Sequence, residues 1–257
     1  MLAGIKEAFP AMKPIRVLLA GAIDYAGLFP PAALPMRDAV RNYRAYLESS
    51  DSWALGRFIV PLEHFRETGL PVEQLSIIVP AGGQIGDLPH VEIKVGAAAG
   101  IRPLPGATVY YEAPVGLLTD VKRSYARAKV RTGGVTADLF PPPEALAAFL
   151  IECARLRLPF KATAGLHHAV RSVRKLTGES GSGSATMHGF LNLFLAADLA
   201  WNGGSEKEIR AALEETSPDA FSFNDAAGQG AGDRFFVSFG SCSFEEPLRE
   251  LKAMGLL

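Results

Sequence analysis

Short apolar segments recur along the chain, and most are followed by a stretch in which the apolar positions have a helical period. Eight of these segments are bounded by glycine or proline and are rich in β-branched or aromatic residues, a pattern typical of buried strands. They cover residues 15–25, 56–61, 75–80, 91–96, 108–114, 128–134, 159–165 and 234–242. Helical periodicity is clearest at 36–49, 117–128 and 142–157. In the last of these, prolines stand at the start of the segment, where a helix tolerates a missing N–H.

Continuous apolar strands that alternate with helices predict a parallel sheet covered on its outer face. Eight such units in 257 residues predict closure into a single (β/α)8 TIM barrel domain spanning residues 1–257. An open doubly wound sheet is the alternative. The first strand lacks the G-x-G-x-x-G turn of dinucleotide folds, so the sequence indicates no nucleotide cofactor.

The connection between the seventh and eighth strands is predicted to be enlarged, with a helical and Gly-rich insertion at residues 169–233. Within it, residues 187–201 are apolar on nearly every side, whereas residues 205–216 form an amphipathic pattern. A helix that is apolar all round must be buried on several sides, and a second subunit is one way to bury it. The glycine-rich tracts at 178–186 and 224–233 are either lids over the site or ordinary surface connections.

Composition limits the kind of partner. The chain is 48% hydrophobic and 21% charged, with a net charge of -1 and both signs interspersed, so it has no basic field for nucleic acid or an anionic membrane. The apolar run at 17–23 is too short to span a bilayer. Cys153 and Cys242 are interpreted as free thiols in a reducing compartment, and we expect a cytoplasmic protein that binds a small molecule.

Polar residues gather where the predicted strands end. In a TIM barrel the chemistry lies at the carboxyl ends of the strands, so these residues are the candidate site. They are Asp24, Lys94, Glu112, Lys129, Arg131, Thr132, Lys161, Thr163, Ser241, Cys242 and Ser243. Period-two alternation puts Lys129 and Arg131 on one face of the sixth strand, and Lys161 and Thr163 on one face of the seventh. If these faces point inward, the two lysines come within reach of one another and depress each other's pKa, which favours an amine that attacks carbonyls.

Several of these segments resemble deoxyribose-phosphate aldolases, in the correct order along much of the chain. "IDYAGLFPPAAL" (23–34), "FIVPLEHF" and "VYYEAPVGLLTD" are similar to the first, second and fifth strands of that family. "KVRTGG" resembles its Lys-Thr-Ser-Thr-Gly-Phe motif and "KATAGLH" its Lys-Ala-Ala-Gly-Gly-Val-Arg motif. "FGSCSFEEPLREL" is similar to its final phosphate-binding loop, which begins here at Gly240.

The resemblance implies a class I aldolase, which needs no cofactor. It makes Lys129 the Schiff-base nucleophile, Lys161 the neighbour that lowers its pKa and moves protons, and Asp24 part of the polar network, with Glu112 at the family's glutamate. It also implies a phosphate cradle at Gly133, Gly134, Gly165, Cys242 and Ser243.

The chain departs from that family at catalytic positions. Lys94 stands where the family has an aspartate, Arg131 replaces a small serine, and His167 and His168 replace a Val/Ile-Arg stretch. Together, Lys94, Lys129, Arg131 and Lys161 make a cationic site. It favours an anionic carbonyl substrate, with a carboxylate held by Arg131.

Other interpretations stay open at this point. Lys129 faces outward if the strand is shifted by one residue, Glu112 is a structural ion-pair partner, and Asp24 only shapes its loop. A metal on the histidines, or Cys242 as a nucleophile, would need partners that the spacing does not reveal. The alternatives to an aldolase-like lyase are an acid–base isomerase or hydrolase, with or without a metal, and a barrel that binds a ligand without catalysis.

Overall fold

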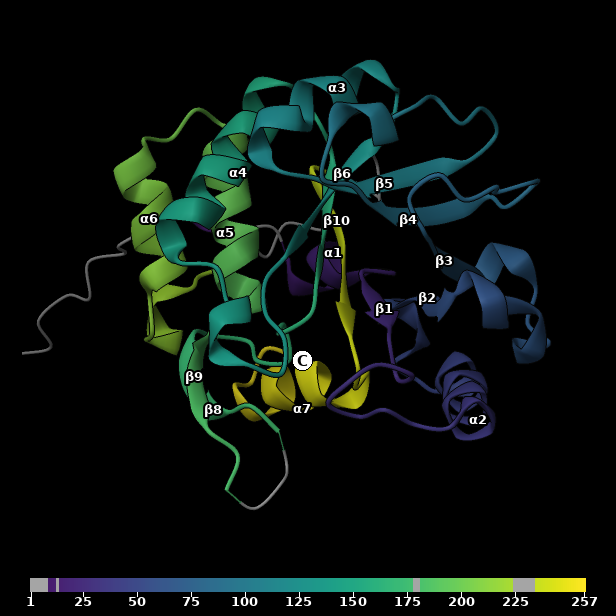
Figure 1. Cartoon of the computed structure of the whole chain (residues 1–257). Coiled ribbons are helices and arrows are strands. Elements are labelled where there is room, and N and C mark those ends of the chain that lie inside the picture. Colours follow the sequence, from purple (N-terminus) through teal and green to yellow (C-terminus); the bar gives the residue numbers. More distant parts are fainter. Residues whose placement is uncertain (1–8, 13, 178–180, 224–233) are drawn as a thin grey trace, which may run out of the picture.

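Eight parallel strands close into a barrel in the computed structural model, which describes residues 9–12, 14–177, 181–223 and 234–257 (Figure 1). The barrel strands are β1 (Ile23–Tyr25), β2 (Leu55–Pro61), β3 (Leu75–Val79), β4 (His90–Lys94), β5 (Thr108–Glu112), β6 (Arg127–Arg131), β7 (Phe160–Thr163) and β10 (Phe236–Ser241). Strands adjacent in the sequence are neighbours in the barrel, and β10 pairs with both β7 and β1 to close it. The predicted closed α/β barrel is therefore confirmed.

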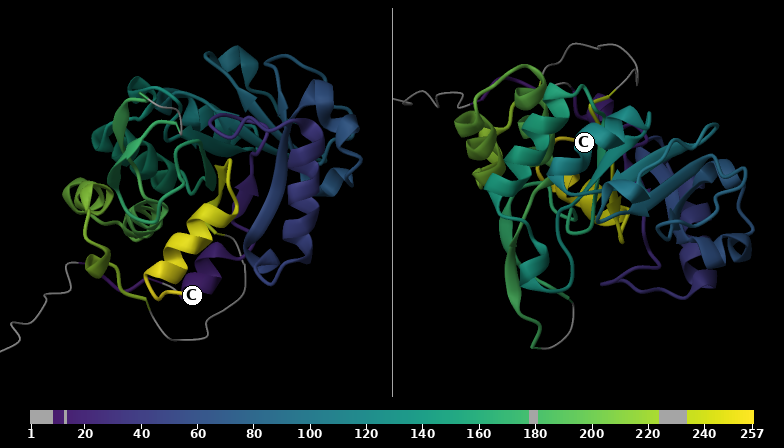
Figure 2. Two further views of the ribbon diagram at one scale, coloured as in Figure 1. Left: turned by 90° about the horizontal axis from the view of Figure 1, so that it is seen from below. Right: turned by 45° about the horizontal axis from the view of Figure 1, so that its top comes forward.

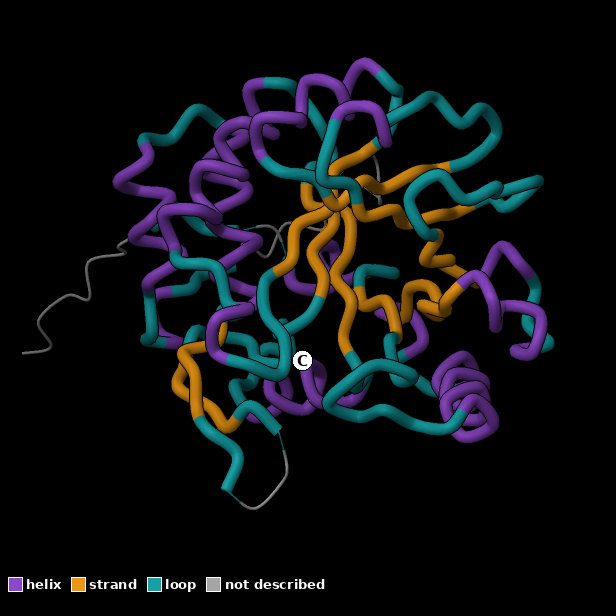
Figure 3. The backbone as a smooth tube through the Cα atoms, viewed as in Figure 1, coloured by secondary structure: helices purple, strands orange, loops and turns teal. Residues whose placement is uncertain are grey.

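Helices cover the barrel unevenly (Figures 1 and 3). The α-helices are α1 (Ile15–Leu19), α2 (Met36–Glu48), α3 (Leu118–Arg123), α4 (Pro143–Arg155), α5 (Phe190–Trp201), α6 (Glu206–Glu214) and α7 (Glu245–Ala253). Short 3-10 helices are η1 (Ser52–Ala54), η2 (Leu62–Thr68), η3 (Val72–Gln74), η4 (Ala98–Gly100), η5 (Val115–Leu117), η6 (Ala137–Leu139) and η7 (Pro218–Ala220). Only 3-10 helices and turns connect β2 through β5, so the α-helical layer is thickest beside β6, β7 and β10.

The first predicted strand and the helix predicted at 117–128 were too long. Residues 15–19 form α1 rather than the start of a strand, because Pro14 at the helix N-cap favours a helix start and the helix buries Ile15 and Leu19. Helix α3 ends at Arg123 instead of running to residue 128. Two residues on, Tyr125 has a φ of 60°, a left-handed conformation that cannot continue a helix.

Between β7 and β10 the chain forms a two-stranded antiparallel sheet and then two helices. The sheet pairs β8 (Ser172–Lys175) with β9 (Ser184–Met187), so part of the tract at 178–186 is a strand. Residues 178–180 and the tract at 224–233, which were predicted to be lids or surface connections, lie outside the described residues. The two-stranded sheet of β8 and β9 lies at the same end of the barrel as α7 (Figures 1 and 2).

Helix α5 is buried within the chain itself. It packs between α4, α6 and the barrel, where Phe190 stacks on Phe239 and Phe194 lies 4.6 Å from Phe236, between ring centroids. Nine of its twelve residues are buried. The all-round apolar pattern is therefore accounted for by neighbouring elements of the same chain and does not require a second subunit.

Candidate functional site

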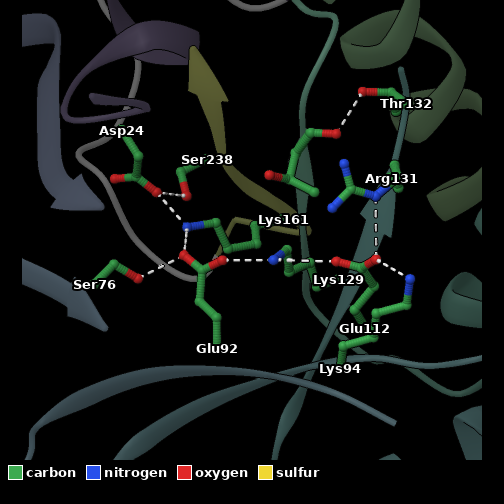
Figure 4. Close-up of polar contacts among 11 residues, drawn as sticks. Asp24, Ser76, Glu92, Lys94, Glu112, Lys129, Arg131, Thr132, Lys161 and Ser238 are labelled. Carbon is green, nitrogen blue, oxygen red and sulfur yellow. Dashed lines mark hydrogen bonds and ion pairs between the residues drawn. The ribbon is translucent and has the colours of Figure 1, made fainter. Parts of the chain in front are cut away.

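The barrel interior holds a row of alternating charges contributed by five strands (Figure 4). Lys161 Nζ on β7 lies 2.6 Å from Asp24 Oδ2 on β1 and 2.5 Å from Glu92 Oε1 on β4. The other oxygen of Glu92 lies 2.8 Å from Lys129 Nζ on β6, which is also 3.2 Å from Glu112 Oε2 on β5. Asp24, Lys161, Glu92, Lys129 and Glu112 therefore form one continuous network.

The strand register explains why these side chains meet. Lys129 lies opposite both Lys161 on β7 and Glu112 on β5, so the three share one level of the barrel. Lys129 is 5% exposed and Lys161 is 1% exposed, which shows that both point inward. The alternation predicted for the sixth and seventh strands is correct, and the outward register of Lys129 is not observed.

Buried hydroxyl groups hold the two innermost carboxylates. Ser76 Oγ on β3 donates to Glu92 Oε1 at 2.6 Å, and Ser238 Oγ on β10 donates to Asp24 Oδ2 at 2.8 Å. The other oxygen of Asp24 accepts from the backbone N–H of Arg57 at 2.7 Å. A Cβ on Gly56 would collide with that oxygen, so the close approach of β2 to Asp24 depends on this glycine. Asp24 is thus a barrel-interior residue rather than a loop-capping one.

The network sets the protonation of its members. Burial would raise the pKa of Glu92, but the charges of Lys129 and Lys161 lower it well below its usual range. Burial opposes the charge of Lys161, yet Asp24 and Glu92 raise its pKa above the ordinary lysine value. The expectation that the two lysines depress each other's pKa is therefore wrong for Lys161, because Glu92 lies between the two ammonium groups.

Glu92 was missed by the sequence reasoning. Lys94, two residues further along β4, was given the position of a catalytic aspartate, but its side chain is 76% exposed and lies 3.8 Å from Glu112. Residues two apart on a strand share a face, and the one nearer the strand end lies closer to solvent. Glu92 is the acidic residue two positions before Lys94 in "VEIKVG", and its place on the same strand face was the sequence signal that could have identified it.

A cavity of about 210 Å³ opens above this network at the carboxyl ends of the strands. Among the predicted site residues, Lys129, Arg131, Gly134, Thr163, His167, Gly240 and Cys242 line it. Lys161 is not among its lining residues. Arg131 is held at one end by Glu112, whose Oε1 lies 3.3 Å from Arg131 Nε. Lys129 is therefore the lysine of the network that meets the cavity.

A second cavity of about 270 Å³ adjoins the first and shares Pro30, Gly134, Ala164 and His167 with it. Gly165 and His168 are among its other lining residues. His168 Nδ1 lies 2.6 Å from Glu250 Oε1 on α7, so this ring is fixed by an ion pair or hydrogen bond to that helix.

Several predicted binding residues make hydrogen bonds within the protein. Thr132 Oγ1 donates to the carbonyl of Ala164 at 2.5 Å and is fully buried. Ser241 Oγ donates to the Ser243 carbonyl at 2.7 Å, and Ser243 Oγ accepts from the Glu246 N–H at 3.1 Å in the first turn of α7. These hydroxyls shape the turns after β6, β7 and β10.

The glycines predicted to cradle a phosphate are required by packing. Gly165 has a φ of 76°, and a Cβ on it would lie 2.9 Å from Gly133 Cα and 3.0 Å from Phe140 Cε1. The turns after β6 and β7 thus touch backbone to backbone beneath the Phe140 ring. This contact accounts for Gly133 and Gly165 without a ligand.

His167 and Cys242 lie together at the edge of the cavity. Cys242 Sγ is 3.9 Å from both ring nitrogens of His167. Burial and the neighbouring His168 lower the pKa of His167 to about 4, and burial raises the pKa of Cys242. Both shifts favour the neutral forms, so this pair is not an activated thiolate–imidazolium nucleophile.

No group of three or more His, Cys, Asp or Glu side chains is arranged to hold a metal ion in the part of the chain that the structure describes. No described helix is long and apolar enough to cross a membrane.

Comparison with known proteins adds no family to this picture. No protein-family model matches the chain, and no curated protein matches it significantly. Any function must therefore be argued from the barrel, its charge network and its cavity.

Proposed function

We propose that this barrel is a class I aldolase-like lyase in which Lys129 forms a Schiff base with a small anionic carbonyl compound. One observation carries the proposal: Lys129 is a buried lysine that borders a cavity at the carboxyl ends of the strands, between two carboxylates. Such carboxylates can accept the ammonium proton and return it during the reaction. The resemblance to deoxyribose-phosphate aldolases supports the same mechanism, and we place the chain as a divergent relative.

The nucleophilic step has a simple proton balance. Lys129 Nζ loses a proton to Glu92 or Glu112, and its lone pair forms a bond to the substrate carbonyl carbon. The nitrogen of this adduct then loses a second proton. The carbonyl oxygen takes up these two protons through the carboxylates and leaves as water, which produces a cationic iminium with one N–H. Lys161 stays protonated between Asp24 and Glu92, so it fixes Glu92 in place rather than attacking the substrate.

Arg131 suggests where the negative charge of the substrate lies. Its Nε donates to Glu112, which is the only ion-pair partner of this guanidinium among the described residues. A carboxylate next to the reacting carbonyl, as in a 2-oxo acid, fits a guanidinium on the same strand face as Lys129. In a 4-hydroxy-2-oxo acid, the C3–C4 bond then breaks, its electron pair enters the iminium, and the C4 hydroxyl loses its proton to give an aldehyde. Protonation of the enamine at C3 and hydrolysis release the second carbonyl product and Lys129.

Borohydride trapping tests the proposal directly. The protein is incubated with pyruvate, reduced, digested and mapped by mass spectrometry, with Lys129→Met, Lys161→Met and Lys94→Met compared. Lys94→Met is the matched control, because it removes an exposed lysine from the neighbouring part of the site. We expect an adduct on Lys129 in the wild type and in Lys94→Met, and none in Lys129→Met. An adduct on Lys161 in the wild type would move the nucleophile to β7.

The second candidate is an acid–base isomerase or hydrolase on the same site. The observation that favours it is that Glu112 lies 3.2 Å from Lys129 and also contacts Arg131, so this pair can exchange protons with a substrate without a covalent bond. A folded protein that forms no adduct with any 2-oxo acid, ketone or aldehyde would support this candidate or a ligand-binding role.

A further inference from the structure

The cavity above Lys129 is charged on one side and apolar on the other. Lys129 and Arg131 project from β6, whereas Ile59 on β2 and Ile78 on β3 line the same cavity. In the closed strand order, β2 lies diametrically opposite β6, and β3 is next to β2. A substrate whose carboxylate and carbonyl meet β6 therefore directs the rest of its carbon chain toward isoleucines.

Apolar residues also form the rim of this cavity. Val135 and Leu139, in the segment that follows β6, are 38% and 37% exposed and line the cavity, as does Phe29 from the loop after β1. Large apolar side chains left in contact with water at a concave site are typical of ligand-binding surfaces. These apolar side chains come from four strands or loops, so the apolar character is not due to one residue.

Few polar side chains in the cavity could form hydrogen bonds with the hydroxyl groups of a hydroxylated substrate. Apart from Lys129 and Arg131, the polar side chains that line it are Thr163, His167 and Cys242. His167 already has Ser241 Oγ 3.1 Å from its Nδ1. A chain with several hydroxyl groups would bury donors and acceptors without partners, and each would weaken binding.

We propose that the substrate is a 4-hydroxy-2-oxo acid whose chain beyond C4 is a short alkyl tail, and that the isoleucine wall selects it over polyhydroxylated chains. The proposal rests on the proposed function, because Lys129 and Arg131 fix the end of the substrate from which the tail extends. The cavity volume of about 210 Å³ is smaller than the about 300–1,000 Å³ of pockets for drug-sized ligands, so the apolar part of the site has room for a tail of a few carbons. A reaction that supplies such a substrate, or one that consumes it, therefore involves alkyl aldehydes rather than sugars.

A matched pair of six-carbon probes tests this selection. The probes are 2-oxohexanoate and 3-deoxy-2-oxohexonate, which carries hydroxyl groups on C4, C5 and C6 of the same chain. Binding is measured by titration calorimetry, and imine formation by borohydride trapping in parallel samples. We expect 2-oxohexanoate to bind the wild-type protein about tenfold more tightly or better, because its tail buries methylene groups and no unpaired hydroxyls.

Ile78→Thr replaces part of the wall by a smaller β-branched side chain that carries a hydroxyl. It should weaken binding of 2-oxohexanoate by about fivefold or more and reduce the preference between the probes. Ile77→Thr is the control, because Ile77 precedes Ile78 on β3 and is buried in the hydrophobic core outside the cavity. It should lower the melting temperature and leave the preference unchanged.

The outcomes separate this inference from the proposed function. Trapping on Lys129 with equal affinities for the two probes would overturn the alkyl selection and leave the Schiff-base mechanism standing. A calorimetric preference for 2-oxohexanoate without any trapped adduct would support the apolar wall and refute the imine. Binding of neither probe to the folded protein would refute both.

Discussion

Substitution of Glu92 by glutamine tests the charge network most directly. Glu92 is 1% exposed and lies between Lys129 and Lys161, at 2.8 and 2.5 Å. Glutamine keeps the size of the side chain but leaves Lys129 with only Glu112 and Lys161 with only Asp24. Removal of one partner from a buried ion pair typically costs about 3–5 kcal/mol, because a charge stays buried without compensation. We expect a loss of this size in the free energy of unfolding.

Thermal and urea denaturation measure the effect. For a domain of this length, a loss of 1 kcal/mol lowers the melting temperature by about 2–4 °C, so a decrease of roughly 10 °C is expected. Glu152→Gln is the matched control. Glu152 pairs with Arg155 at the protein surface, where such pairs contribute about 0–1 kcal/mol.

A double variant with Lys161→Met separates charge from packing. Removing both the Glu92 and the Lys161 charge leaves the net charge of the network unchanged and leaves no unpaired Lys161 ammonium group, so the double variant should lose at least about 1 kcal/mol less than the sum of the single losses. If Glu92→Gln changes stability no more than Glu152→Gln does, or if the double variant is additive, the network does not have the energetic role argued here.

Two further predictions concern the rim of the site. His167 has a pKa of about 4 in the folded protein against 6.5 for an unperturbed histidine, so acid favours the unfolded state, which binds the proton first. Stability should fall between pH 6.5 and 4 by up to about 3 kcal/mol, and His167→Gln should flatten that part of a stability–pH profile measured by urea denaturation; an unchanged slope would contradict the burial argument. Gly165→Ala places a Cβ 2.9 Å from Gly133 Cα at a φ of 76°, and should cost at least about 1 kcal/mol in the same assay, whereas a neutral result would show that the two turns can separate.

The positions of the barrel strands could be predicted because each depends on a local pattern. Buried parallel strands require short apolar runs between turn residues, and the chain shows eight of them. The ends of elements were less predictable. Residues 15–19 form a helix and Tyr125 ends another in a left-handed conformation, and neither feature has a periodic signal.

The part of the site that depends on strand alternation could be predicted from the sequence. The part that depends on contacts with neighbouring strands and turns was missed. Alternation put Lys129 and Arg131 on one strand face and Lys161 and Thr163 on another but left open which face points inward, and the burial of both lysines shows that their faces do. Alternation could not show that Glu92 separates the two lysines, because that depends on the depth of β4 relative to β6 and β7. Thr132 and Ser243 look like ligand-binding residues in the sequence, but their hydroxyls are used by nearby backbone groups. Which partner a short hydroxyl side chain takes is decided by tertiary contacts.

The arrangement of charges bears on which covalent state the site would stabilise. A protonated Lys129 is paired with Glu92 and Glu112, and an iminium on the same nitrogen would keep the positive charge and hence both ion pairs. A neutral enamine would lose that charge and leave two carboxylates facing it. Under the proposed mechanism, the network therefore favours formation of the iminium and its recovery by protonation of the enamine. Lys161 contacts Glu92 on the side away from Lys129, so this preference depends on residues of the barrel interior. The apolar wall across the cavity, under the same proposal, selects the carbonyl compound that binds next to Lys129.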